Sequence, residues 1–230
     1  MLTALAVLGG IALVVALFMQ RGRDGIDLSL GGLTRVYLYL ASLAGVIVFT
    51  IGLAGVLSYV LAAAFGLDVV YGGPRPQIQP AQPFPVCAPG TPCPPFTPPP
   101  IQPFPDDRVR QQGDDLVRGL TFLVFGGLFF GAHWWARRAL AVTSERATPL
   151  YRAYLILGTV IFGIATIALL PMGIYQALSF AIVPATQFTF RSGAGDALSG
   201  GLAALPIWLT FLWLVQRTLR TTSTTQPAVA

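Results

Sequence analysis

The sequence is short of charge and of chemically reactive side chains. Charged residues make up 10% of the 230 residues, lysine is absent, and there are one histidine and two cysteines. Soluble globular domains carry roughly 25% charged residues, so this composition excludes an ordinary soluble domain. Apolar residues make up 54% of the chain and the mean hydropathy is +0.70. The composition indicates a protein that lies in lipid.

The single histidine, His133, excludes a haem held between two histidines, and the three methionines form no recognisable partner motif. A proton relay would require carboxylates within the apolar stretches, and these stretches have none. We therefore interpret His133 as an interfacial residue that hydrogen-bonds a headgroup, the backbone or a neighbour. No nucleophile–base pair, phosphate loop or metal-ligand cluster is visible, so we expect no enzyme activity, cofactor or metal site.

Five stretches contain no charged residue, and about 18 to 20 such residues cross a bilayer core as a helix. They are Leu2–Met19, Val36–Phe65, Gly119–Ala136, Ala153–Ile182 and Leu198–Val215. The sequence therefore predicts an all-α polytopic bundle of five spans. We expect an N-terminal helix (1–20), two two-helix units (33–66 with 114–138, and 149–182 with 197–217), a loop (72–112) between the helices of the first unit, and a tail (218–230).

The arginines predict the orientation of the spans. A cleaved signal peptide has positive charge before its apolar region, whereas Arg21 and Arg23 follow the first span. We expect a retained helix with its N-terminus outside. Segments 20–35, 137–152 and 216–230 are then cytoplasmic, and they hold nine of the fourteen arginines. Because the arginines flank spans and do not form one basic face, we expect no nucleic-acid partner.

The two cysteines, Cys87 and Cys93, both fall in the predicted outer loop around a Pro-Gly turn. An oxidising compartment would allow a disulfide between them. Free thiols and a two-thiolate metal site are the alternatives, although no further cysteine or histidine is nearby. The loop from Gly72 to Asp107 holds most of the nineteen prolines, so it is either a stiff spacer or an extended docking arm.

Short motifs repeat in the same order in the two predicted units. Leu-x-Arg-x-Tyr-Leu opens the second and fourth spans, Gly-Asp-x-Leu-x-x-Gly-Leu opens the third and fifth, and Trp-x-x-x-Arg ends both of these. The order indicates a duplicated hairpin, both copies entering the membrane from the same side. We expect interfacial roles for Arg35, Tyr37, Tyr39, His133, Trp134, Arg138, Arg152, Tyr154, Trp213 and Arg217, and helix caps at Asp114 and Asp196.

The third span contains a GxxxG pattern at Gly127 and Gly131. Small residues four apart allow another backbone to approach closely. We expect these glycines to pack within the chain, against the second span, in preference to forming a dimer. Phe129 and Phe130 would then face lipid or a partner subunit.

The Arg35-x-Tyr37-x-Tyr39 start, the His133-Trp134 end, and the run from Leu205 to Leu209 resemble a bacterial membrane family catalogued only as a domain of unknown function. The resemblance covers residues 33–217 without the outer loop, and Leu212 stands in the second copy where the first has His133. It implies a multi-pass protein of the bacterial cytoplasmic membrane, and because the family has no assigned activity, it supports the architecture only.

Three functions fit these patterns. The first is a non-catalytic accessory or scaffold subunit of a larger membrane complex, whose partners are the lipid bilayer and other membrane subunits. The second is a small transporter or lipid-binding protein that uses the cleft between the two units. A sensor ranks last, because the sequence offers no cytoplasmic output domain.

Overall fold

The computed structural model describes residues 30–73, 107–140, 149–183 and 192–223. Within these ranges the protein is all-helical, as predicted. Four helices are long and apolar enough to cross a membrane. The predicted N-terminal span (1–20), Cys87, Cys93 and residues 224–230 lie outside the described residues. The helices are α2 (Leu30–Phe65), α3 (Leu67–Tyr71), α4 (Asp107–Ala139), α5 (Pro149–Ile182) and α6 (Gly195–Ser223).

Two helix boundaries differ from the prediction. Helix α4 begins at Asp107, so the last residues of the predicted loop (72–112) are helical, and α6 continues to Ser223 into the predicted tail. At this early start, Arg108 forms an ion pair with Asp68 of α3. The helix thus extends beyond its apolar stretch into residues that make polar contacts.

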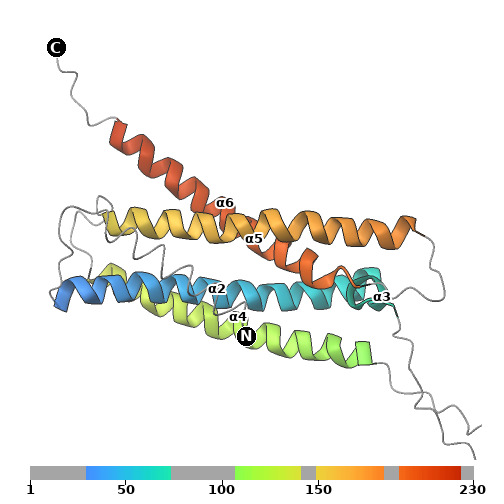
Figure 1. The fold of residues 1–230 in the computed structure, drawn as a ribbon. Coiled ribbons are helices and arrows are strands. Elements are labelled where there is room, and N and C mark those ends of the chain that lie inside the picture. The colour runs from blue at the N-terminus through green and yellow to red at the C-terminus, as the bar shows by residue number, and fades with distance from the viewer. Residues whose placement is uncertain (1–29, 74–106, 141–148, 184–191, 224–230) are drawn as a thin grey trace, which may run out of the picture.

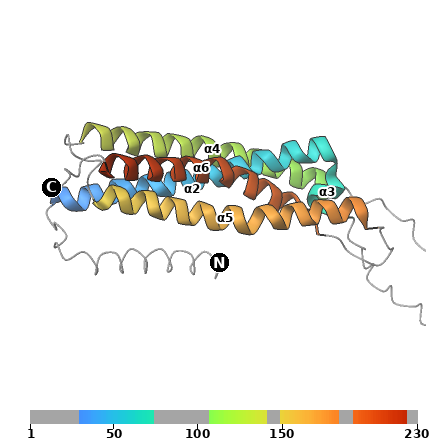
Figure 2. The ribbon, with the colours of Figure 1, turned by 90° about the horizontal axis from the view of Figure 1, so that it is seen from above.

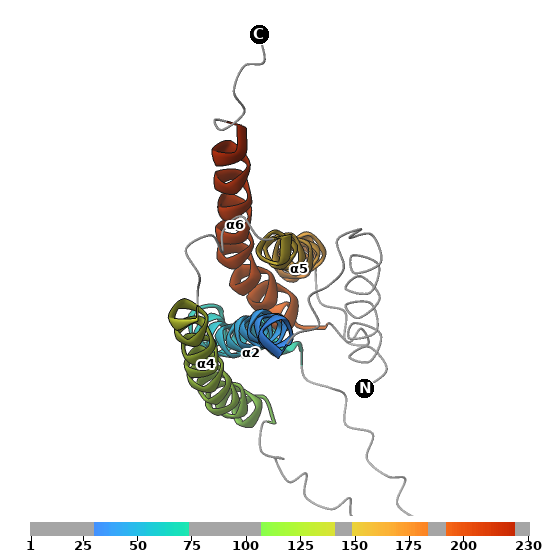
Figure 3. The same cartoon turned by 90° about the vertical axis from the view of Figure 1, so that its left-hand side faces the viewer.

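Helix α2 lies at the centre of the bundle. It contacts α4 on one side and the α5–α6 pair on the other (Figures 1 and 3). Neighbours α2 and α4 run antiparallel, and so do α5 and α6 (Figure 2). With 36 residues, α2 is about 54 Å long at 1.5 Å per residue. It is therefore longer than the roughly 30 Å hydrocarbon core.

The bundle has two chemically different ends, the α3 end and the basic end. At the α3 end, α2 and α5 finish and α4 and α6 begin. At the opposite, basic end lie Arg35, Arg137, Arg138, Arg152, Arg217 and Arg220. Gly66, with φ of 93°, allows the chain to turn from α2 into the short helix α3.

A cluster of buried side chains fills the seam between α2 and the α5–α6 pair. Its members are Tyr39, Leu43, Tyr154, Leu155, Phe162, Ala204 and Phe211. Further along the seam, the Ser58 hydroxyl donates a buried hydrogen bond of 2.8 Å to the Ser199 hydroxyl. The centre of the bundle is thus held by apolar packing and by one polar contact between α2 and α6.

Glycines bring α2 and α4 into backbone contact. A Cβ on Gly126 of α4 would lie 2.8 Å from the Cα of Phe49, and one on Gly119 would lie 2.7 Å from the backbone nitrogen of Val56. From the other helix, a Cβ on Gly55 would lie 2.9 Å from the Cα of Gly119. No side chain fits at these positions without moving a helix, which is how membrane helices gain close packing.

Candidate functional site

The α3 end joins the two ends of the segment 74–106. Arg108 at the start of α4 forms an ion pair with the Asp68 carboxylate and hydrogen-bonds the Gly72 carbonyl at 3.4 Å. Asp68 is in the first turn of α3, Gly72 directly follows that helix, and Arg108 lies where the chain enters α4. The Arg108 guanidinium group therefore bridges the described chain on either side of this proline-rich segment.

The same short helix is attached to α6. The Ala194 backbone N–H donates a 2.8 Å hydrogen bond to the carbonyl of Val69. Gly193 lies so close to the Val70 carbonyl that a Cβ would overlap it. Helix α3 is thus fixed between the beginnings of α4 and α6 (Figure 1).

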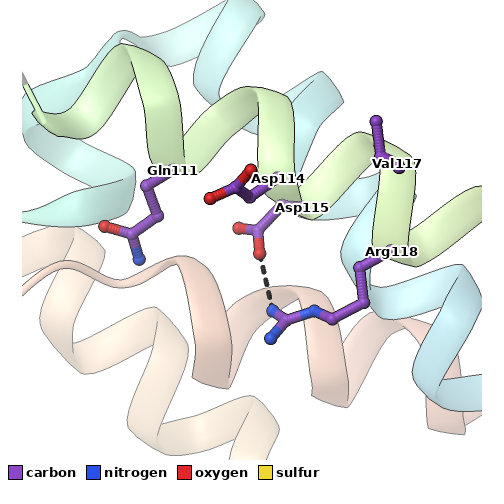
Figure 4. A pocket seen from close by; sticks show the side chains of 5 residues that line it. All are labelled: Gln111, Asp114, Asp115, Val117 and Arg118. Carbon is purple, nitrogen blue, oxygen red and sulfur yellow. Dashed lines mark hydrogen bonds and ion pairs between the residues drawn. The ribbon is translucent and has the colours of Figure 1, made fainter.

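Asp115 of α4 is the buried carboxylate of this end, with 4% of its surface exposed. Its Oδ2 accepts a 3.1 Å hydrogen bond from the Tyr71 hydroxyl, and its Oδ1 pairs with Arg118 at 2.7 Å. Figure 4 shows the Arg118 side chain reaching back along α4 to Asp115. Burial, followed by the negative charge of Asp115, raises the pKa of the Tyr71 phenol well above its usual value.

An open hollow of about 450 Å³ lies beside this group, lined by Gln111, Asp114, Asp115, Val117 and Arg118 (Figure 4). The prediction that Asp114 caps α4 was wrong, because the helix begins seven residues earlier, at Asp107. Asp196 does lie in the first turn of α6, where its charge interacts favourably with the helix dipole.

At the basic end, both predicted Trp-x-x-x-Arg pairs are in contact. The Arg138 guanidinium carbon lies 3.7 Å from the centre of the Trp134 ring, and that of Arg217 lies 5.5 Å from the Trp213 ring. Arg35 and Arg152 are exposed at the same end. These contacts keep cationic groups against the rings that favour the membrane interface.

His133 bonds both the backbone and a neighbour, two of the three partners that were predicted. Its Nδ1 lies 2.8 Å from the Phe129 carbonyl oxygen, and its Nε2 lies 3.3 Å from the Tyr37 hydroxyl. Because a carbonyl only accepts, Nδ1–H is the donor there, and in the neutral ring Nε2 accepts from Tyr37. The contact ties the start of α2 to the end of α4.

Two tyrosines predicted to face the interface are buried between helices. Tyr39 of α2 and Tyr154 of α5 have ring centres 5.3 Å apart, and Tyr154 also contacts Phe211. Arg137 of α4 covers both, with its guanidinium carbon 4.5 Å from the Tyr39 ring and 5.2 Å from the Tyr154 ring. All four long helices contribute a side chain to this cluster.

The prediction for the third span was correct about the neighbouring helix and wrong about the glycines. A Cβ on Gly131 would meet nothing within 4 Å, and one on Gly127 would meet only the Phe49 ring, at 3.6 Å. The close approach uses Gly119 and Gly126, seven residues apart. The backbone and Cβ of Phe130 also pack on Gly45. Phe130 is half-buried, whereas Phe129 is exposed, as a lipid-facing residue would be.

The contacts of Tyr71, Asp115, Arg137 and the Ser58–Ser199 pair were not predicted. Isolated serines inside otherwise apolar stretches were an available signal for an interhelical hydrogen bond. Asp115 carried no such signal, since it adjoins Asp114 and only the fold distinguishes them. Within the described ranges, no group of three or more His, Cys, Asp or Glu residues is placed to hold a metal ion.

Helix length, composition and the glycine packing define the chain as a helical bundle of the membrane-spanning class. A family model described as a domain of unknown function (DUF5671) matches residues 101–210, which covers α4, α5 and most of α6. The predicted resemblance to a family catalogued only as a domain of unknown function is confirmed, with Arg35, Tyr37 and Tyr39 outside the matched range. Neither the curated proteins nor the solved structures contain a match.

Proposed function

We propose that the protein is a non-catalytic accessory or scaffold subunit of a larger membrane complex. The observation that carries the proposal is the attachment of the proline-rich segment at the α3 end. Arg108 joins the chain before and after residues 74–106, and α3 is itself fixed to α6 through Val69 and Ala194. A segment held at both ends on a packed platform reaches a partner with less loss of conformational freedom than a free loop.

The filled seam argues against the alternative function, a transporter or lipid-binding protein that uses the cleft between the two units. The cluster around Leu43, Leu155 and Phe211 occupies the region where such a cleft would lie. The Ser58–Ser199 hydrogen bond crosses the same seam. A transport path there would require these buried contacts to separate.

The exposed surface of α4 supports a scaffold role. This helix packs mainly on α2, and large apolar side chains cover its remaining faces. They include Val117, Phe122, Phe125, Leu128, Phe129 and Trp135. Such a surface suits lipid or the helices of neighbouring subunits, which associate by side-chain packing.

The proposal includes two parallel hairpin units, α2–α4 and α5–α6. Gly119 and Gly201 occupy the same position of the repeated Gly-Asp motif, and each lies against its partner helix. A Cβ on Gly119 would lie 2.7 Å from Val56 of α2, and one on Gly201 would lie 2.8 Å from Leu170 of α5. When the two units are aligned on their repeated motifs, Val56 and Leu170 lie within one helical turn of equivalent positions. The two Trp–Arg contacts support the same duplication.

We further propose a bacterial inner membrane location with the basic end in the cytoplasm and the α3 end outside. The arginine-rich basic end follows the positive-inside rule. An N-terminal helix (1–20) would enter from the outside, and the proline-rich segment would face the extracytoplasmic compartment, where a Cys87–Cys93 disulfide is stable.

The test is purification from native membranes in mild detergent. The wild-type chain is expected to co-migrate with other membrane subunits at a constant ratio. A variant with residues 78–103 replaced by a Gly/Ser linker is expected to lose them while its melting temperature stays unchanged. Arg108→Gln should weaken the same association, and Arg110→Gln, which removes a charge one turn or less away, serves as the control. A chain that migrates alone, with an outer segment cleaved by protease in native membranes, would exclude the scaffold role.

A further inference from the structure

Arg137 and Arg138 are adjacent in α4 but lie in different surroundings. Successive helical residues point about 100° apart. Arg138 is exposed and stacks on Trp134 of its own helix. Arg137 instead turns toward the bundle and lies over Tyr39 of α2 and Tyr154 of α5. One arginine thus faces outward, and the other is inserted between helices.

The charge of Arg137 is not matched by an acid of the described chain. Its Nη1 atom is buried and has no hydrogen-bond acceptor among the described residues. Every carboxylate that the structure describes lies at the other end of the bundle, on Asp68, Asp107, Asp114, Asp115 and Asp196. The two tyrosine rings supply cation–π attraction, but rings do not neutralise a charge. The Tyr154 side chain also interacts with Arg137 by a hydrogen bond, but it is neutral, and a partly buried cation without a counter-ion is unfavourable.

The depth of Arg137 in the membrane indicates which class of anion could bind it. Trp134 and Trp213, with their stacked arginines, form the aromatic belt of the basic end, and such belts lie at the depth of the lipid headgroups. Arg137 follows Trp134 by less than one helical turn. Arg137 as a whole residue is half-buried, although its Nη1 is covered, so an anion at this depth has access to the exposed part of the side chain. Guanidinium groups bind phosphate oxygens in pairs.

We propose that Arg137, at the junction of α2, α4 and α5, is a binding site for a phosphate group. The group comes either from the headgroup of an anionic lipid or from free phosphate. Bound there, it supplies the negative charge that the described chain does not provide, and it tightens the contact between the end of α4 and the start of α5. The site is independent of the proline-rich segment and of any partner subunit.

The experiment compares three forms of the full chain in detergent: wild type, Arg137→Gln and Arg138→Gln. Each is titrated with phosphatidylglycerol, with diacylglycerol, which lacks the phosphate, and with sodium phosphate, and the melting temperature is recorded. Phosphatidylglycerol is expected to raise the melting temperature of the wild type and of Arg138→Gln. Loss of the paired, charged contact in Arg137→Gln should weaken its apparent affinity about tenfold or more. Diacylglycerol should have no effect.

The phosphate titration distinguishes the two sources. A shift with sodium phosphate at similar concentration assigns the site to free phosphate, and its absence assigns the site to a lipid headgroup. The proposal would be overturned if phosphatidylglycerol shifted the melting temperatures of wild type and Arg137→Gln equally. It would also be overturned if Arg138→Gln lost as much affinity as Arg137→Gln, or if diacylglycerol shifted the melting temperature.

If Arg137→Gln does not fold, Arg137→Met replaces it in the same titrations, with the same expected outcomes. The unbranched methionine side chain keeps the packing against both rings. Without ligand, Arg137→Met should melt no lower than the wild type, since it removes an unmatched charge. A marked loss of stability without ligand would show that the arginine is satisfied within the chain, and it would also overturn the proposal.

Discussion

Gly126 of α4 lies against the backbone of Phe49 in α2, so that a Cβ at this glycine would be 2.8 Å from the Phe49 Cα. Five residues further along the same helix, Gly131 faces open space. The two glycines are chemically identical and nearly adjacent, and the tertiary structure gives them opposite roles. This contrast provides a matched test of the packing.

Gly126→Leu is expected to destabilise the bundle, because the side chain must push α2 and α4 apart. Overpacking typically costs about 1–3 kcal/mol. Gly131→Leu should change the stability by no more than about 0.5 kcal/mol. The measurement is thermal unfolding in detergent, followed by circular dichroism. Equal melting temperatures for the two variants would contradict the helix contact described above.

The Ser58–Ser199 hydrogen bond should couple the two halves of the bundle. Each single alanine variant leaves one buried hydroxyl without its partner, at a cost of about 1 kcal/mol. The double variant should lose less stability than the sum of the losses in the two single variants. Thr121→Ala is the control, since within the described ranges the Thr121 hydroxyl donates to the Val117 carbonyl of its own helix and not to another helix. Strictly additive losses would show that the two serines do not interact.

The contact between Tyr71 and Asp115 predicts a pH dependence at the α3 end. The folded protein raises the pKa of the Tyr71 phenol, whereas an unfolded tyrosine ionises near pH 10. The folded state therefore keeps a proton that the unfolded chain releases, and stability from this contact falls as the pH rises above about 10.

The free energy of unfolding of the wild type should accordingly exceed that of Tyr71→Phe by about 1 kcal/mol at pH 8. This difference in stability should shrink by pH 11. Tyr175→Phe, at a side chain that is 73% exposed, serves as the control and should have little effect at either pH. Chemical denaturation in detergent at the two pH values measures both variants. A difference that does not change with pH would remove Tyr71 as the titrating group.

The predicted orientation can be tested through the only two cysteines, Cys87 and Cys93. After mild reduction, a membrane-impermeant thiol reagent should label intact cells from the outside. Without reduction, labelling should be weak, because the pair is expected to be oxidised in that compartment. Labelling that requires access from the cytosolic side would reverse the orientation.

The sequence alone determined the spans that the structure describes. Uncharged stretches of this length must satisfy their backbone hydrogen bonds internally, so they form helices, and the Trp134–Arg138 and Trp213–Arg217 pairs follow from helical spacing within one segment. Local physics decides these features. The helical stretches were predicted correctly, whereas the contacts between the Trp and Arg side chains were not among the predictions. The start of α4 at Asp107 was not predicted, because the residues before Gly119 include charged side chains and lie outside the uncharged stretch.

Only the tertiary structure decided which face of each helix turns inward. Nearly every face of these helices is apolar, so hydrophobic periodicity does not distinguish a lipid-facing side from a packed one. Gly119 and Gly126 therefore could not be preferred over Gly127 and Gly131, and the burial of Tyr39 and Tyr154 was not predicted. For the same reason, the different surroundings of Arg137 and Arg138 depend on the positions of α2 and α5, which neither arginine specifies by itself.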